Sequence, residues 1–459
     1  MRAGAEQQYR RMTGAPLPRL IASLSVPTVV SSVISSVYNL TDTYFVSQLG
    51  TAASAAVGVV FSLQSLIQAF GYGFGMGAGA IAARSLGEKN EKRAAVCTAS
   101  AFCVAFVFGV LLAVLCVPNL DAVMRLFGAN DDCIGYAREY AFWILLGAPL
   151  MASTFVLNIV MRSCGKTGLS MAGIGVGAVV NLLLDPFFIS EKYLNLGMAG
   201  AAIATIIGQM FGFAVFAVFY ATGKSVVPFS FRNVSRRFSD YWDIVRTGAP
   251  TIFRQGMACV SSLFLNRAIK PFGTAALAAL TIANKLYLFI RGLLLGIGQG
   301  YQSVAGYNYG AGQYARVRRG FWITVMYGTV VAVLFTGILA GFAPQIMRVF
   351  RAEDAEVVEY GAFALAAYCF SLPFLAYSSY VNQTLQSLGQ VKSASFLALC
   401  RNGILYLPLL AVLPRLFGLT GIQTVQPIAD LLTCAVSVPF QIVFFRKLMQ
   451  NDGENGKTA

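Results

Sequence analysis

Histidine is absent from this sequence of 459 residues, and charged residues make up only 12% of it. Without an imidazole, the chain has no histidine-based catalysis, metal site or proton relay. Average soluble domains contain about 25% charged residues, so this chain, with a mean hydropathy of +0.67, is too apolar for a water-soluble fold of its size. The nine cysteines include no C-x-x-C pair, which indicates small apolar packing groups and no disulfide framework.

The apolar residues gather in long runs without a single charge. Four of these runs, 94–118, 193–223, 321–347 and 360–391, contain between 25 and 32 residues. A helix needs about 20 apolar residues to cross the hydrocarbon of a bilayer. The chain is therefore predicted to be an all-α polytopic membrane protein with twelve transmembrane helices. The predicted spans are 17–48, 52–83, 94–118, 133–163, 167–190, 197–222, 241–270, 274–309, 316–343, 355–388, 391–416 and 421–447.

The formal net charge of +15 is distributed in a way that argues against nucleic acid as a partner. With the N-terminus inside, 22 Lys and Arg residues lie on the cytoplasmic side, eight lie on the opposite side and four lie within spans. This bias is typical of a multi-pass membrane protein with both termini in the cytoplasm. The expected partner of the basic residues is therefore the bilayer.

The two halves of the chain repeat one unit. Residues 21–93 and 244–316 align without a gap at an offset of 223, and 19 of the 73 positions are identical. Such a repeat predicts two similar six-helix lobes. The matched positions include Pro27 with Pro250, Gly50 with Gly273, Gly73 with Gly296, Gly77 with Gly300 and, after one inserted residue, Pro149 with Pro373, Asn158 with Asn382 and Gly165 with Gly389.

Six spans in each repeat is an even number, so both repeats enter the membrane from the same side. We therefore expect a pseudo-symmetry axis along the membrane normal, and a cleft between the two lobes that suits alternating access. The predicted segments are a cytoplasmic N-terminal segment (1–16), the first lobe (17–222), a cytoplasmic linker (223–240), the second lobe (241–447) and a cytoplasmic tail (448–459).

Five alternating glycines, at positions 71, 73, 75, 77 and 79, lie deep inside the second span. A phosphate-binding loop would need a strand before it, and none is expected here. The spacing instead indicates small residues that allow neighbouring helices to approach closely, or a span that bends.

Two carboxylates of the first lobe lie within apolar runs. Asp42 is the only charged residue between Leu20 and Ala83, and Asp185 ends the run NLLLD in the fifth span. A charge inside a span is costly and is a candidate functional group by default. Polar neighbours surround them: Tyr38 and Asn39 lie about one turn before Asp42, Asn181 lies one turn before Asp185, and Thr205 and Gln209 form a polar pair in the sixth span.

Two carboxyl groups that meet in a low-dielectric site titrate as a coupled pair and can hold a proton near neutral pH. The same oxygens, with the amide of Asn181, also suit a hard cation such as Na⁺. The alternative is that Asp42 and Asp185 only satisfy helix ends at the outer surface. Their repeat mates are Leu265 and Leu409, so the second lobe lacks the pair.

The second lobe instead contains buried cations, namely Arg254, Lys285, Arg291 and Arg401. Arg401 and Asp430 lie near mid-depth in adjacent antiparallel spans, which predicts a structural ion pair. Lys285 and Arg291 have no acidic partner in their own span, so at least one is expected to face the substrate cavity. The predicted cavity residues are Gln68, Asn158, Gln209, Lys285 and Arg291.

Several stretches of the sequence are characteristic when they are taken together and in order. They are SVP (25–27), YNLTDTYFVSQLG (38–50), GYGFGMGAGAIAARSLG (71–87), NLLLDP (181–186), GAAIATIIGQ (200–209) and GQGYQSVAGYNYGAG (298–312). With them the chain resembles the multidrug and toxic compound extrusion (MATE) transporters, nearest the bacterial MepA-like group. The resemblance extends over about residues 17–447.

The resemblance implies a secondary antiporter, not an enzyme, that needs no cofactor and acts as a monomer in the bacterial cytoplasmic membrane. It would export drugs or other small organic compounds, driven by influx of H⁺ or Na⁺. Pro27 removes a backbone hydrogen bond from the first span and is the predicted hinge. The ion-coupling residues implied by the resemblance are Tyr38, Asn39, Asp42, Asn181, Asp185 and Thr205, with Na⁺ at Asp42, Asp185 and Asn181.

Some members of that family use acidic residues in spans seven, eight or ten, where this chain has Arg254, Lys285 and Arg291 and no buried Asp or Glu. The usual preference for cationic substrates is therefore open here. Three other functions also remain as alternatives. A flippase for lipids or lipid-linked oligosaccharides would carry more cavity-lining cations, and the second lobe has some. The lopsided charges argue against a channel, and the absence of a visible nucleophile–base or metal constellation argues against an intramembrane enzyme.

Overall fold

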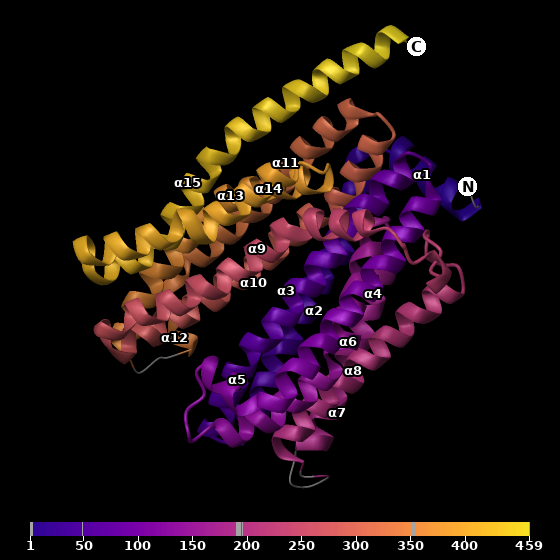
Figure 1. Ribbon diagram of the computed structural model, residues 1–459. Helices are drawn as coiled ribbons and strands as arrows, with labels where there is room; N and C mark the ends of the chain where they lie inside the picture. Colours follow the sequence, from indigo (N-terminus) through magenta and orange to yellow (C-terminus); the bar gives the residue numbers. More distant parts are fainter. Residues whose placement is uncertain (1–2, 48, 190–193, 195, 351–353, 459) are drawn as a thin grey trace. The chain divides into compact units, whose positions relative to one another are not determined.

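The computed structural model describes residues 3–47, 49–189, 194, 196–350 and 354–458, and these residues form helices and turns, with no strand among them. Figure 1 shows long helices packed side by side within each half of the chain. The long helices of the first repeat are α2 (Leu17–Ser47), α3 (Thr51–Gly87), α4 (Glu91–Cys116), α6 (Ile134–Ser163), α7 (Thr167–Ile189) and α8 (Gly197–Ala221). Those of the second are α9 (Phe238–Ile269), α10 (Gly273–Gly310), α11 (Tyr314–Gly341), α13 (Ala355–Ser387) and α15 (Tyr406–Thr458), and the nine-residue α14 (Val391–Leu399) precedes α15.

Besides three 3-10 turns, the described chain contains four further short helices. They are α1 (Ala3–Gly14), α5 (Leu120–Leu126), α12 (Ala343–Phe350) and a π-helix, η4 (Cys400–Ile404), between α14 and α15. A π-helical turn inserts an extra residue into a helix and often marks a functional position. Here it contains Arg401, one of the predicted buried cations.

Ten helical stretches of the described residues are long and apolar enough to cross a membrane. One of them, Val391–Asp452, has 62 residues and breaks at Gly418, where φ is 56°, so it is long enough for two spans. Helix α9, with 32 residues, is also long enough, but polar residues such as Arg254 and Gln255 make it less apolar. With these two additions the helices agree with the predicted twelve spans, and the all-α membrane fold is confirmed.

The sequence repeat is also present in the backbone. Gly50 and Gly273 have φ values of 111° and 88°, and Gly165 and Gly389 have values of 79° and 81°. Glycine adopts positive φ without a steric penalty, so these matched turns require it. The short helices α5 and α12 begin at positions 120 and 343, which are 223 residues apart like the aligned repeats.

Contacts divide the chain into two compact units. The first consists of Met1–Arg11 and Val30–Ile252, and the second of Met12–Val29 and Phe253–Ala459. The division therefore falls inside α2, just after Pro27, and inside α9, just after Pro250. The units therefore differ from the predicted lobes at two places. The first part of α2 belongs to the second unit, and the first part of α9 belongs to the first unit.

The glycines of α3 allow close helix packing in the first unit. A Cβ atom on Gly75 would lie 2.8 Å from the side chain of Ile159 on α6, and one on Gly77 would overlap the carbonyl oxygen of Ile244 on α9. Gly71 and Gly79 likewise face α6. Alternating glycines thus serve two helix faces, as small residues do in membrane helix pairs.

The same packing recurs in the second unit, where the first part of α2 contacts α10. Cβ atoms on Gly296 and Gly300 would press against the backbone of Val29 and Ser25. Ser25 Oγ donates to the carbonyl oxygen of Ile297 at 3.1 Å, and Thr28 Oγ1 donates to that of Gly296 at 2.6 Å. Each unit therefore includes the first part of the helix that begins the other repeat, α9 in the first unit and α2 in the second.

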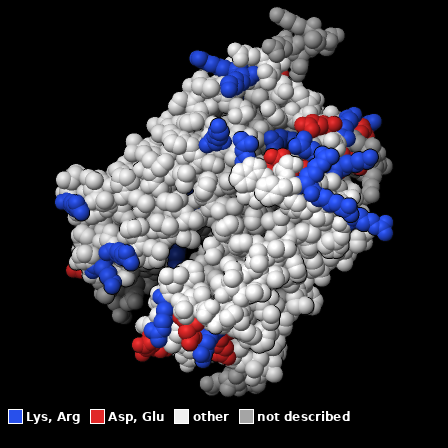
Figure 2. Space-filling view, in the orientation of Figure 1, with Lys and Arg blue, Asp and Glu red and all other residues white. Residues whose placement is uncertain are grey.

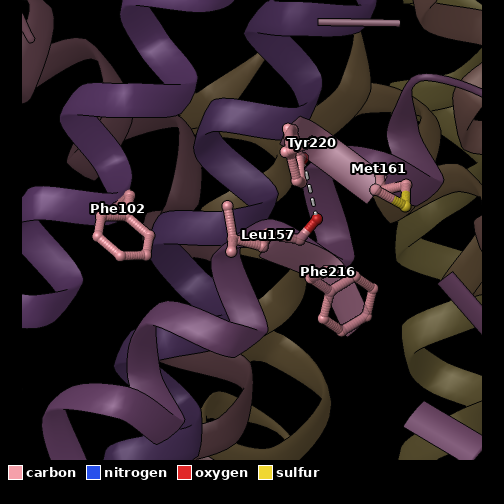
Figure 3. Packing of buried hydrophobic residues seen from close by; sticks show 5 residues of the cluster. All are labelled: Phe102, Leu157, Met161, Phe216 and Tyr220. Atoms are coloured by element: carbon pink, nitrogen blue, oxygen red, sulfur yellow. Dashed lines mark hydrogen bonds between the residues drawn. The ribbon is translucent and has the colours of Figure 1, made fainter. Parts of the chain in front are cut away.

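Aromatic and aliphatic side chains fill the core of the first unit. Phe102, Leu157, Met161, Phe216 and Tyr220 form a cluster between α4, α6 and α8 (Figure 3). None of the five is more than 8% exposed. The hydroxyl group of Tyr220 donates to the carbonyl oxygen of Leu157 at 3.2 Å, so its polar end is satisfied inside the core. Phe216 also forms part of a cavity wall, so this core fixes the shape of the site described below.

Large apolar side chains are exposed along the outer faces of the helices. On α4, Val107, Leu111, Val114 and Leu115 are between 53% and 70% exposed. Their spacing places them on one helix face. Figure 2 shows charged side chains gathered toward the helix ends, with broad uncharged surfaces between them. Such surfaces suit the hydrocarbon of a bilayer.

The glycine packing predicts which substitutions in α3 destabilise the protein. Gly77→Ala places a methyl group against the backbone of Ile244, and overpacking of this kind costs about 1–3 kcal/mol. Gly58, on the same helix, has no atom within 4 Å of its Cβ position. Gly58→Ala should therefore leave stability unchanged or raise it by roughly 0.5–1 kcal/mol. Thermal unfolding of both purified variants in detergent checks the prediction, which is wrong if both melt at the same temperature.

Candidate functional site

A cavity of about 210 Å³ lies within the first unit, between α2, α3, α6, α7 and α8. Its walls combine aromatic and small residues, such as Tyr72, Phe155 and Gly177, with polar side chains. Seven of the residues predicted from the sequence line it. They are Tyr38, Asn39, Gln68, Asn158, Asn181, Thr205 and Gln209.

Asn181 connects the cavity to a buried carboxylate. Its Nδ2 donates to Asp185 Oδ1 at 3.2 Å and to Thr205 Oγ1 at 3.4 Å. All three residues are at most 3% exposed. The contact between α7 and α8 depends on Gly208, because a Cβ atom there would lie 2.9 Å from Cβ of Asn181. The structure thus brings Asn181, Asp185 and Thr205 together, although Asp185 itself does not line the cavity.

Asp42 approaches this cluster from α2. It is half-buried and interacts electrostatically with Asp185, so carboxylates 143 residues apart in the chain act on one another. Tyr38, one turn earlier on the same helix, interacts with Asp42, with Asp185 and with Thr205. Neither carboxylate accepts a hydrogen bond from a helix-end N–H within the described part of the chain.

Three oxygen atoms of this cluster have no hydrogen-bond donor among the described residues. They are Asp42 Oδ1, Asn181 Oδ1 and Asp185 Oδ2, and all three are buried. Buried acceptors are almost always paired in proteins. We call Asp42, Asn181, Asp185 and Thr205 the acidic cluster. Its surplus of acceptors suits a proton or a small cation coordinated by oxygen.

Tyr140 is part of this site, and the sequence analysis did not identify it. It lies on α6, is 1% exposed, and interacts with Thr205 and with both aspartates. Its segment, AREYAFW, carries no motif. A tyrosine in an apolar run is usually a packing residue, so only the tertiary contacts distinguish it.

Two predicted residues use their amides elsewhere. Asn39 is exposed, and its Nδ2 donates to the carbonyl oxygen of Ser35 at 2.7 Å. Asn158 Nδ2 donates to the carbonyl oxygen of Ser170 at 3.3 Å. Its repeat mate Asn382 donates in the same way to Ala394, at 2.6 Å. The asparagine at this repeat position therefore joins two helices in each repeat, and Asn158 also lines the cavity.

The position that corresponds to the acidic cluster is apolar in the second unit. Leu265, Leu409 and Ala429 are the repeat mates of Asp42, Asp185 and Thr205. All three belong to one hydrophobic cluster with Tyr406, Leu410 and Val425. The same position of the fold is therefore polar in the first repeat and apolar in the second.

The second unit contains a buried ion pair. Arg401 Nε lies 2.8 Å from Asp430 Oδ1, and the two side chains are 6% and 0% exposed. This confirms the predicted pair. Asp430 also accepts from Tyr287 at 2.6 Å, Ser371 at 3.1 Å and Gln426 at 3.1 Å, and Arg401 Nη2 donates to the Tyr287 hydroxyl at 2.8 Å.

The other predicted cations of the second repeat occupy different surroundings. Lys285 is exposed on α10, whereas Arg291 on the same helix and Arg254 on α9 are half-buried. Both Lys285 and Arg291 belong to the second unit, and neither lines the cavity of the first.

Fold and site together define a two-repeat helical membrane protein with an acidic cluster in one repeat and a buried Arg401–Asp430 ion pair in the other. The MatE family model matches residues 27–187 and 250–412, once in each repeat. The chain belongs to this family, and the resemblance noted in the sequence is confirmed.

Similar proteins agree with this assignment. A protein named "Multidrug export protein MepA" from Staphylococcus saprophyticus is 25% identical over 93% of this chain and 94% of its own. A crystal structure of MATE in complex with MaL6 has a TM-score of 0.91 at 23% identity, covering 98% of this chain and 100% of that one. A MOP superfamily transporter from Pyrococcus furiosus, described with the words "reverse polarity of binding pocket suggests different function", has a TM-score of 0.89 at 24% identity, covering 96% and 98%.

The ion pair of the second unit makes a prediction about stability. Breaking one partner of a buried pair costs about 3–5 kcal/mol. Asp430→Asn should cost more than Arg401→Gln, because Asp430 keeps three donors without Arg401, whereas Arg401 without Asp430 keeps only Tyr287. The double variant should regain part of the loss.

Thermal unfolding in detergent measures all three variants. The surface pair Arg138–Asp121, at 3.6 Å and more than half exposed, is the control, and Arg138→Gln should cost less than about 1 kcal/mol. Equal melting temperatures for the Asp430→Asn variant and the control would contradict the prediction.

Proposed function

We propose that the chain is a secondary antiporter that exports drugs or other small organic compounds across the bacterial cytoplasmic membrane, driven by the entry of H⁺ or Na⁺, with both termini in the cytoplasm. The observation that carries this proposal is the set of three buried oxygens of the acidic cluster for which the described residues supply no donor. The printed name of the Staphylococcus relative, a multidrug export protein, supports the class of substrate.

Ion binding at the acidic cluster follows from the free energy of the unpaired oxygens. A buried acceptor without a donor costs about 1–3 kcal/mol, and more when it is charged. A proton on Asp42 or Asp185, or Na⁺ among the carboxylate oxygens and Asn181 Oδ1, lowers this penalty. The repulsion between the two carboxylates falls in the same step, because one negative charge is neutralised.

Asn181 couples the ion to the cavity. Its amide group binds Asp185 and Thr205, and the same side chain lines the cavity wall. Ion binding at Asp185 changes the acceptor that Asn181 Nδ2 meets, and thereby changes the polar surface that a substrate meets. The ion and the substrate would both contact Asn181, so the binding of one changes the affinity for the other. Exchange of ion for substrate requires this coupling.

Pro27 is the proposed hinge of this exchange. It lies inside α2, which carries Asp42, and the division between the compact units falls just after it. Proline removes a helix hydrogen bond, so bending at this point costs little. A change of charge at Asp42 would therefore be transmitted along α2 to this point.

The flippase alternative is less well supported. The MatE family match covers both repeats, and the curated relative is an exporter by name.

Loss of either carboxylate should abolish coupling. Asp42→Asn and Asp185→Asn keep the side-chain shape but remove the charge, so concentrative ethidium export from proteoliposomes should fall at least about tenfold, the factor that roughly 1.4 kcal/mol represents. Separate proton and sodium gradients identify the ion. Asp121→Asn, at an exposed position on α5, is the control and should export normally. Concentrative export by both cluster variants at the wild-type rate would refute the proposal.

Removal of the hinge proline should slow transport without unfolding the protein. Pro27→Ala restores a helix hydrogen bond and stiffens α2, so the export rate should fall several-fold while the melting temperature stays the same or rises. Pro250→Ala is the matched variant, at the same repeat position but on α9, which carries no cluster carboxylate. If only Pro250→Ala slows export, the moving helix is α9 and not α2.

A further inference from the structure

Three arginines of the second unit lie close enough to interact with one another, and one of them pairs with Asp430. They come from α9 (Arg254), α10 (Arg291) and η4 (Arg401). Arg291 interacts electrostatically with both other arginines and with Asp430, and Arg254 interacts with Arg401. The backbone geometry agrees, since Asn402 Nδ2, next to Arg401, donates to the carbonyl oxygen of Arg254 at 3.5 Å.

The one carboxylate is already fully used. Asp430 accepts from four side chains, with Arg401 and Tyr287 the nearest. Within the described residues, neither Arg254 nor Arg291 forms a salt bridge, and Nε of Arg291 is buried without an acceptor. Three positive charges thus share one negative charge, which leaves the group with a surplus of positive charge inside a membrane-spanning unit.

The arginines differ in their access to solutes. Arg401 is only 5% exposed and is fixed between Asp430 and Tyr287, whereas Arg254 and Arg291 are half-buried. Tyr287 lies one turn before Arg291 on α10, so the inner ion pair also fixes the helix that carries the outer guanidinium group. The inner pair therefore serves as a rigid support, and of the three arginines Arg254 and Arg291 are the two that have no acidic partner among the described residues.

We infer that Arg254 and Arg291 form a binding site for an oxyanion, namely the carboxylate, sulfonate or phosphate group of an organic anion. A guanidinium group offers several N–H donors in a planar fork that matches such groups. Unpaired charges inside a membrane protein are expensive and are usually functional. This site extends the proposed function by assigning a substrate class, and it depends on that function only for the export step.

Fluorescein and rhodamine 123 test this inference, because they share one ring skeleton but carry opposite charges. The full-length protein in nanodiscs of phosphatidylcholine is titrated with each dye by fluorescence anisotropy, without any ion gradient. Fluorescein should bind more tightly than rhodamine 123. Arg254→Gln and Arg291→Gln should each weaken fluorescein binding by about tenfold or more. Arg267→Gln, an exposed position on the same helix as Arg254, should change it less than about twofold.

Two further arms complete the test. Where a glutamine variant fails to fold, Arg254→Lys or Arg291→Lys retains the charge but loses the planar fork, and fluorescein binding should be weaker than in the wild type. Nanodiscs with phosphatidylglycerol distinguish a lipid headgroup from a soluble anion. If phosphatidylglycerol weakens fluorescein binding to the wild type but not to the arginine variants, the lipid headgroup occupies the site. Equal binding of the two dyes, or wild-type fluorescein binding by the arginine variants, overturns the inference. Because no gradient is used, failure of the antiport proposal leaves this result unaffected.

Discussion

Polar atoms that are buried in a membrane protein need partners within the protein, because hydrocarbon offers none. This constraint bears on two buried polar clusters of the structure. Among the described residues, three acceptors of the acidic cluster in the first unit have no donor. In the second unit Asp430 accepts from four donors, and Arg291 Nε has no acceptor within the same described part of the chain. One cluster therefore lacks positive charge and the other has too much of it, although the two arose from one repeated fold.

The repeat explains how such opposite sites coexist. Matched glycines, prolines and asparagine bonds keep the helix packing the same in both halves, as the Asn158 and Asn382 contacts demonstrate. Within that fixed packing, individual side chains differ freely. Leu265, Leu409 and Ala429 fill the position that Asp42, Asp185 and Thr205 occupy in the first unit. A single helix arrangement thus holds an acidic, polar cluster in one repeat and an apolar core in the other.

Close helix approach is the second condition on which the sites depend. Gly208 admits Asn181 to the α7–α8 contact, and Gly75 and Gly77 bring α3 against two neighbours. These glycines carry no chemistry themselves, but they set the distances at which polar side chains meet. The proline positions complement them, since Pro27 and Pro250 lie beside the points where the chain passes from one compact unit to the other.

The sequence alone determined the class of protein, the twelve spans, the repeat and the Arg401–Asp430 pair, because hydropathy and helical spacing are local properties of the chain. It also named Asp42 and Asp185, since a charge in an apolar run is conspicuous wherever it lies in space. Only the tertiary structure decided that the two aspartates interact, that Tyr140 joins them, and that Arg254 and Arg291 flank Arg401. It also decided that the first parts of α2 and α9 change units. These facts depend on contacts between different helices, and no local pattern specifies which helix faces meet.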